Sequence, residues 1–514
     1  MADMNACRQN GFAQDGCPQA GCPQPTPAGQ PSPSAVPAAP SAPACQPSPS
    51  APAVRLESDS IGELEVPADA YYGVQTLRAF HNFPITGRTL HPVFLKNLAL
   101  IKKAAAVTNC GAGALSPERA GAIIQACDEV AAGGLASSFI VDAIQGGAGT
   151  SANMNMNEVV ANRAGELLGD ALGSYAKVHP NDHVNMSQST NDVIPSAGKL
   201  TAIDLLRTLE ASLAALHREL DRKAVEFDDV LKMGRTQLED AVPMRLGQTF
   251  QGYASMVARC ETRLSDVERE MLVMNLGGTA IGSAINVPPY YLRNIVPTLA
   301  QLKGYPLVQA QDLFDATENL DCFVAVSGAV KSCAMSLSKM CNDLRLLASG
   351  PRTGFGEINL PAMQNGSSIM PGKVNPVIPE VVNQAAFQVM GNDVTISMAA
   401  EAGQMELNAF EPVIFHNLFE ELDVLRNSVD TLTVNCVAGI TANRERCREL
   451  MEMSVGASTA LVPYIGYAKA AEIAKTALRT KRNVRDIVLE QGLLGPEVLD
   501  RIEDPYAMTE PKTE

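Results

Sequence analysis

The chain has 514 residues, which is too long for one ordinary domain, so we expect two or three domains with large buried cores. Its formal net charge of −16 at pH 7 argues against nucleic acid or an anionic membrane as a partner, because both repel an acidic surface. No segment approaches the length of a membrane span, and the N-terminus lacks the basic start and apolar run of a signal peptide, so we expect a cytoplasmic protein.

Residues 1–54 form an N-terminal segment of distinct composition. They hold twelve of the 33 prolines among Ala, Ser and Gln. Such a segment cannot bury enough surface to offset the entropy of ordering, so we expect a disordered tail. The 12 cysteines are dispersed along the chain, which favours reduced core thiols over a disulfide framework. Cys17 and Cys22 lack a completing ligand set, and no two of the six histidines form a metal-binding helical pair, so no metal site is expected.

A mostly helical N-terminal domain is expected over residues 55–190. Gly146–Glu158 is a glycine turn followed by hydroxyls and amides, and it lacks a complete Gly-x-Gly-x-x-Gly because residue 152 is alanine, so a dinucleotide site is unsupported. Pro180–Asp192 supplies a second dense set of small hydrogen-bonding side chains. It is equally typical of an N-cap cluster for the helix that follows, and Asp192 can serve both purposes.

The central region, residues 191–445, carries the clearest periodicity, because apolar residues there recur alternately three and four positions apart. These runs cover residues 206–220, 250–274, 323–347 and 418–436. Each predicts a long amphipathic helix, and four such helices in one chain indicate an elongated bundle. With a shorter helix over about 379–398 they predict a mainly α fold with a central five-helix bundle. The periodicity weakens after residue 445, which indicates a small C-terminal domain over 446–514.

Two polar segments interrupt this region. Lys232–Gln248, between the first two long helices, reads as a polar loop. In Gln364–Pro376 two glycines and two prolines exclude a regular helix or strand, while two adjacent hydroxyls, a lysine and amides can hold an anion. This second loop lacks the Gly-x-Ser-x-Gly elbow and the phosphate-loop ending, which argues against acyl transfer and nucleotide hydrolysis, although an ordinary polar turn stays open.

Gly366-Ser-Ser-Ile-Met-Pro-Gly-Lys-Val-Asn-Pro376 resembles the signature loop of the aspartase and fumarase superfamily. Glu65–Thr76, Gly146–Glu158 and Lys232–Gln248 resemble further segments of that family, and the resemblance covers about residues 55–514. It implies a three-domain helical fold and a homotetramer in which three subunits build each site for a small dicarboxylate. It implies no required cofactor, and it leaves activation by a divalent cation such as Mg²⁺ open.

The resemblance also implies a role for each candidate site residue. Ser367 is the base, acting as an alkoxide that backbone N–H groups stabilise once its loop closes. The carboxylate beside the deprotonated carbon is held by Thr150, Ser189, Thr190 and Ser368. The other carboxylate is held by Lys373 and Asn375. The leaving amine is contacted by Asn191 and Thr236. Gln237 stands where fumarases and argininosuccinate lyases carry histidine, and Glu380 is expected behind the substrate contacts, where the family pairs it with that histidine.

Several positions distinguish the two branches of the superfamily. Gln237, Tyr72 in place of a tryptophan, Thr190 after Ser189 and Glu411-Pro-Val favour aspartases, which convert L-aspartate to fumarate and ammonia, a carbon–nitrogen lyase reaction. His179-Pro-Asn-Asp leans toward fumarases. Gln237 weighs most, because expelling hydroxide from malate needs a general acid that glutamine cannot supply. Fumarate hydration stays an alternative, as does a structural or binding protein like the lens crystallins, although every site position carries a competent residue.

Overall fold

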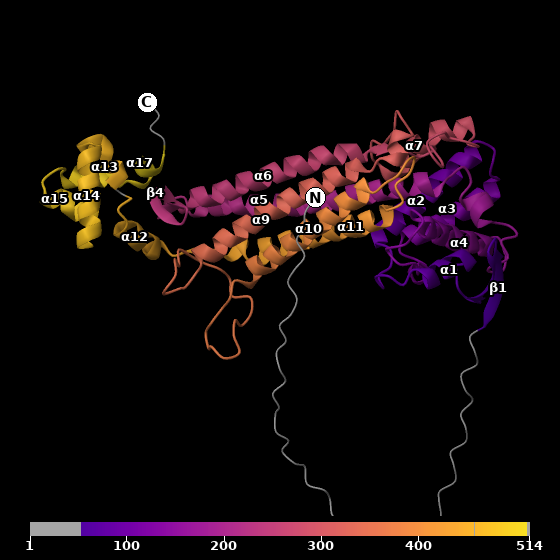
Figure 1. Cartoon of the computed structure of the whole chain (residues 1–514), viewed down its shortest axis with the longest axis horizontal. Helices are drawn as coiled ribbons and strands as arrows, with labels where there is room; N and C mark the ends of the chain where they lie inside the picture. Colours follow the sequence, from indigo (N-terminus) through magenta and orange to yellow (C-terminus); the bar gives the residue numbers. More distant parts are fainter. Residues whose placement is uncertain (1–52, 457, 511–514) are drawn as a thin grey trace, which may run out of the picture. The chain divides into compact units, whose positions relative to one another are not determined.

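The computed structural model describes residues 53–456 and 458–510, and Figure 1 shows that helices dominate this part of the chain. The mainly α fold predicted from the sequence is therefore confirmed. The expected tail lies outside the described residues apart from its last two positions, of which Val54 already begins strand β1 (Val54–Asp59). No helix in the described ranges is long and apolar enough to cross a membrane.

The N-terminal region joins a short hairpin to a group of helices. Strand β1 pairs antiparallel with β2 (Gly62–Pro67). The elements that follow are α1 (Val74–Asn82), α2 (Pro92–Gly111), α3 (Pro117–Ala131), a 3-10 turn (Ala136–Ser138), α4 (Thr150–Leu167) and a π-helical turn (Pro180–Val184). Buried Glu158 of α4 accepts hydrogen bonds from the backbone N–H groups of Gly73, Gln75 and Thr76 at 2.8–3.1 Å. These bonds satisfy the free donors at the start of α1 and fasten it to α4.

Five long helices form the central bundle. They are α5 (Thr190–Glu226), α6 (Leu246–Met271), α9 (Asp321–Leu347), α10 (Val377–Glu401) and α11 (Glu411–Asn435), and they run side by side in Figure 1. Leu206 and Leu213 of α5, Val257 of α6 and Leu337 of α9 are all 0% exposed, so the periodic apolar residues do form the core. The predicted five-helix bundle is confirmed.

Two details of the bundle prediction were wrong. Helix α10 has 25 residues, as many as α11 and fewer than the 27 of α9, but it is longer than the expected stretch of about 379–398. The helix begins at Val377, directly after Pro376, and the apolar pattern alone did not predict this start. The second periodic run also extended too far, since α6 ends at Met271 and Met274 lies in the short strand β5 (Val273–Met274). Met274 is nevertheless fully buried, so the burial of the periodic apolar side chains extends beyond the end of the helix.

The start of α5 is fixed by a reciprocal cap. The Ser189 hydroxyl accepts from the N–H of Asn191 at 3.2 Å, and the Asp192 carboxylate accepts from the N–H of Ser189 at 2.9 Å. Pro195 cannot donate to the Asn191 carbonyl, which instead accepts from the Asn275 side chain at 3.0 Å. The tight positioning of residues 189–191 therefore comes from side chains on both sides of the helix start.

Lys232–Gln248 was expected to be a polar loop, and that expectation was wrong. Strands β3 (Leu231–Thr236) and β4 (Glu239–Arg245) form an antiparallel hairpin there. Gln237 and Leu238 make the two-residue turn with φ of 57° and 66°, the left-handed geometry that fits the twist of a hairpin. No Asn-Gly pair marks this turn in the sequence, and the strands are held by Glu357, which lies 2.8 Å from Arg235 and 3.2 Å from Lys232.

The remaining elements are short. Those between the long helices are α7 (Pro289–Lys303), β6 (Val308–Gln309), α8 (Asp315–Glu318) and β7 (Ile358–Asn359), and a 3-10 turn (Val437–Gly439) and β8 (Thr441–Ala442) follow α11. The C-terminal ones are α12 (Arg444–Met453), α13 (Ser458–Ile465), α14 (Tyr467–Thr480), α15 (Val484–Glu490), α16 (Pro496–Ile502) and α17 (Pro505–Thr509). Helices α13 to α16 enclose an apolar cluster of their own that includes Leu461, Ile473 and Val488. The expected boundary at residue 446 falls inside α12, and the domain limits stay a prediction.

Candidate active site

The loop between α9 and α10 presents Ser367 to backbone donors. Its Oγ accepts hydrogen bonds from the N–H groups of Ile369 at 3.2 Å and Met370 at 3.1 Å. Two backbone dipoles aimed at one oxygen favour its anionic form over the neutral hydroxyl. This is the geometry that a serine base requires.

The neck of this loop is closed by main-chain contacts. The N–H of Gly366 donates to the Lys373 carbonyl at 2.9 Å, and the Asn375 side chain donates to the Gly366 carbonyl at 3.0 Å. A Cβ on Gly366 would lie only 2.5 Å from the Lys373 carbonyl oxygen, so this close approach requires glycine. The neck therefore holds the loop together while residues 368–374 remain exposed.

Lys373 and Ser368 lie on the exposed side of the loop. No carboxylate among the residues that the structure describes pairs with Lys373, so its ammonium group is placed to receive an anion from outside the loop. Glu380, in the first turn of α10, lies 3.9 Å from Arg345 of α9. The family pairs this glutamate with a histidine, whereas the contact here is with an arginine.

A second group of expected site residues lies at two helix N-termini. Thr150 is the first residue of α4, and Ser189, Thr190 and Asn191 begin α5. Gly149 precedes α4 with φ of 82°, and a Cβ there would meet Ile194 of α5 at 2.8 Å, so the two helix starts approach closely. The positive ends of both helix dipoles reinforce the hydroxyls in attracting a carboxylate.

The α5 start is backed by buried polar groups, of which Asp192 was expected from the sequence but Asn153 and Lys102 were not. Burial raises the pKa of Asp192 to about 6, although the N–H groups of Ser189, Gly277 and Thr279 oppose that shift. The Asn191 side chain donates to the Ala280 carbonyl at 2.8 Å. The Thr190 hydroxyl accepts from Asn153 at 3.1 Å, and Asn153 in turn contacts the buried Lys102.

The third group lies at the tip of the β3–β4 hairpin. Thr236 ends β3 and Gln237 occupies the turn, and both are exposed. Leu238 beside them is 68% exposed. The tip therefore presents an apolar and a polar side chain together.

One chain does not bring these three groups together. Helix α5 separates the Thr190 end from the hairpin and has 37 residues, which makes it about 55 Å long. Helix α10 leads from the Ser367 loop back toward the end of the bundle where α5 begins and has 25 residues, about 37 Å. A substrate with four carbons cannot bridge such distances. The expected residues therefore lie in separate parts of the chain, with the Thr190 group at the other end of the bundle from the Ser367 loop.

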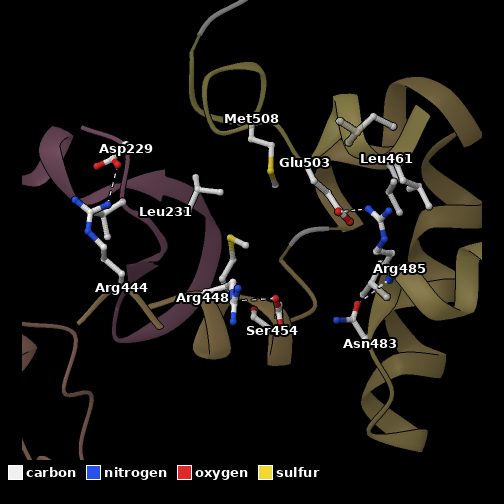
Figure 2. Close-up of a pocket in the computed structure, with 16 residues that line it drawn as sticks. Asp229, Leu231, Arg444, Arg448, Ser454, Leu461, Asn483, Arg485, Glu503 and Met508 are labelled. Atoms are coloured by element: carbon white, nitrogen blue, oxygen red, sulfur yellow. Dashed lines mark hydrogen bonds and ion pairs between the residues drawn. The ribbon is translucent and has the colours of Figure 1, made fainter. Parts of the chain in front are cut away.

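A cavity of about 380 Å³ lies between the hairpin base and the C-terminal helices, and Figure 2 shows its lining. Its arginines are already paired, Arg444 with Asp229 at 2.8 Å, and Arg485 with Glu503. None of the expected site residues lines it. Within residues 53–456 and 458–510, no group of three or more His, Cys, Asp or Glu side chains is placed to hold a metal ion.

Family models match most of the described chain. A model described as Lyase matches residues 62–391, and one for the fumarase C C-terminus matches residues 458–510. The chain belongs to the aspartase and fumarase family of lyases. Its family membership agrees with the resemblance of the Gly366–Pro376 loop and extends it to the C-terminal helices.

Relatives within the family are similar over nearly their full length. Aspartate ammonia-lyase from Bacillus sp. is 51% identical, with 89% of this chain and 98% of the relative covered. The enzyme of that name from Escherichia coli K12 is 48% identical, with 87% and 95% covered.

Solved structures of the family have the same fold. A fumarate lyase:delta crystallin from Brucella melitensis bound to cobalt superposes with a TM-score of 0.87 at 48% identity, covering 89% of this chain and 100% of that one. A class II fumarase from Schistosoma mansoni gives 0.85 at 36% identity, covering 89% and 99%. Both of these solved structures therefore share the architecture of this chain.

Proposed function

We infer that this chain is an aspartate ammonia-lyase, a carbon–nitrogen lyase that converts L-aspartate reversibly to fumarate and ammonia. Relatives of that name match it at about 50% identity over nearly their whole length. The observation that carries the choice of leaving group is Gln237 at the hairpin tip. A glutamine cannot deliver a proton, so the site suits a group that leaves without needing one.

The reaction begins with removal of a proton from the carbon beside the β-carboxylate. Ser367 as an alkoxide accepts this proton, and the electron pair of the C–H bond moves into the carboxylate to give a dianionic intermediate. The N–H groups of Ile369 and Met370 lower the cost of the alkoxide, because they already point at Oγ. The neck contact between Gly366 and Lys373 keeps those donors in place.

Negative charge then develops on the β-carboxylate, at the point where donors are concentrated. Thr150, Ser189 and Thr190 lie at the N-termini of α4 and α5, so hydroxyl groups and two helix dipoles act on the same anion. Ser368 adds a fourth hydroxyl from the loop. Donors fixed in advance stabilise the intermediate more than the substrate, since the charge is larger there.

The α-carboxylate and the amine complete the substrate contacts. Lys373 pairs with the α-carboxylate and Asn375 donates to it from the loop neck. Asn191 and Thr236 contact the ammonium group. The C–N bond breaks as the carbanion electrons form the double bond, and the bonding pair leaves with nitrogen as neutral ammonia, so no acid is required at Gln237.

We propose that the active unit is a homotetramer with three subunits contributing to each site. The separation of the three residue groups along α5 and α10 supports this, because no single chain brings them within reach of one substrate. Phe387, Val394 and Met398 also form an apolar stripe on α10 and are 57–67% exposed in the single chain. A stripe of this kind on a long helix is typical of a helix-to-helix contact between subunits.

We further propose that the protein groups named above suffice for the reaction without a cofactor, since each step uses a hydroxyl, an amide or a lysine. Activation by Mg²⁺ is tested by comparing turnover after chelation and after addition of the cation. A cytoplasmic location is supported by Cys127, Cys260, Cys333 and other cysteines that are free thiols in the described chain, as a reducing compartment would keep them.

The deciding experiment measures product formation by the purified protein from L-aspartate and from L-malate. We expect fumarate and ammonia from aspartate and little fumarate from malate. Efficient release of fumarate from malate, with aspartate ignored, would identify the chain as a hydratase and show that Gln237 was given too much weight. A folded tetramer that acts on neither substrate would favour a structural or binding role.

A further inference from the structure

Lys102 of α2 lies at the centre of a buried polar cluster behind the start of α5. Its side chain is 0% exposed. Its ammonium group donates to three amide oxygens, on Asn153 at 2.7 Å, Asn185 at 2.9 Å and Gln188 at 3.0 Å. All three of its N–H donors are therefore used, and no carboxylate in the described part of the chain forms an ion pair with it.

Asn153 of α4 connects this lysine to Thr190. Burial lowers the pKa of Lys102 to about 7. In its protonated form the Lys102 ammonium can only donate, so Asn153 turns its carbonyl oxygen toward Lys102 and its amide nitrogen to the other side. That nitrogen donates to the Thr190 hydroxyl oxygen at 3.1 Å and to Asn185 at 3.2 Å. The Thr190 oxygen thus accepts from the protein side. Its own hydrogen remains to be donated toward the exposed face of the helix start.

The other two amides hold the backbone that leads into α5. With its oxygen on Lys102, Gln188 donates to the carbonyls of Val184 at 2.9 Å and Met186 at 3.1 Å. Asn185 similarly donates to the Gln188 carbonyl at 3.2 Å. One cation thereby sets the orientation of three side chains in the two segments that carry Thr150 and Ser189.

We propose that Lys102 is a positioning residue for the β-carboxylate end of the site: its ammonium group orients Asn153 so that Thr190 presents its hydroxyl hydrogen to the substrate. This inference rests on the proposed role of Thr190 in holding that carboxylate. If Lys102 is lost, the Asn153 amide is free to turn over, and its oxygen then takes the Thr190 hydrogen instead. The substrate carboxylate would lose a donor without any change in the residues that touch it.

The inhibition constant of succinate tests this path, because succinate carries both carboxylates but no amine and cannot be deaminated. We expect Lys102→Met to raise that constant about tenfold in the native background, the size of one lost hydrogen bond. In a Thr190→Val background, Lys102→Met should raise the inhibition constant less than about twofold, because the Thr190 hydroxyl through which Lys102 acts is already missing. Lys103→Met is the matched control. Lys103 is the next residue on α2, pairs with Asp128 at 2.7 Å, and should leave the constant unchanged.

Equal effects of Lys102→Met in the two backgrounds would overturn the inference and leave Lys102 a structural residue. If Thr190→Val alone does not weaken succinate binding, the proposed carboxylate site fails, and this inference fails with it for a distinguishable reason. Should Lys102→Met not fold, Asn153→Leu interrupts the same path while leaving Lys102 two of its acceptors. Asn153→Leu should likewise raise the inhibition constant in the native background and much less in the Thr190→Val background. Equal effects of Asn153→Leu in the two backgrounds would contradict the proposal.

Discussion

Replacing Ser367 with alanine removes the proposed base and little else. The lost Oγ is an acceptor for two backbone N–H groups in an exposed loop, and water can take its place there, so we expect a stability change within about 0.5 kcal/mol. Loss of general-base catalysis lowers turnover by about 10²- to 10⁴-fold, which corresponds to about 3–5 kcal/mol in the barrier. The Michaelis constant for aspartate should change little, because the carboxylate donors remain.

The assay follows fumarate formation by its ultraviolet absorbance, with circular dichroism and sedimentation to confirm fold and assembly. Ser368→Ala is the matched control, since it removes the neighbouring hydroxyl, which donates to a carboxylate but is not the base. We expect Ser368→Ala to lower turnover by about tenfold, the scale of one lost hydrogen bond. Native turnover in a folded, assembled Ser367→Ala protein would refute the assignment of the base.

Three further outcomes follow from the loop and the bundle. Lys373→Ala should raise the Michaelis constant and lower turnover together, because a carboxylate without its cation is poorly held in both ground and transition states; an unchanged Michaelis constant would assign this lysine elsewhere. Gly366→Ala would place a Cβ 2.5 Å from the Lys373 carbonyl oxygen, so the loop neck must open and turnover should fall by about 10- to 100-fold, whereas native kinetics would show that the neck is not needed. Phe387→Arg puts a charge in the exposed α10 stripe and should shift sedimentation toward smaller species, and an undisturbed tetramer would place the subunit contact on another face.

The sequence predicted the bundle well because its helices are long and strongly periodic. The stripe through Leu206 and Leu213 could have only one buried face, and the apolar run over 323–347 ends at the same residue as α9. The hairpin was missed because its strands are short and its turn, Gln237-Leu238, carries neither glycine nor asparagine. Contacts of Arg235 and Lys232 with Glu357 stabilise the hairpin, which the local strand propensity of its residues did not indicate.

The types of the candidate site residues could be predicted from the sequence, but the buried residues that hold them in place could not. Ser367 and Lys373 stood out as polar side chains in a loop, and Thr190, which begins α5, was expected from the family resemblance. Lys102 did not, because it stands beside Lys103 in an otherwise apolar stretch of α2, and two adjacent lysines there are typical of surface residues. Its burial depends on amides of Asn153 and Gln188 that come from distant parts of the chain, and only the fold brings them together.

The central claim is that each site combines groups from different subunits, and mixing two inactive variants tests it most directly. One variant carries Ser367→Ala, and the other carries Thr150→Val with Thr190→Val. If the loop and the helix starts of a site come from different subunits, randomly mixed tetramers should recover about a quarter of the native number of sites, since each contribution is intact in half the cases. Co-expressed variants that assemble into mixed tetramers yet stay as inactive as either parent would contradict the account.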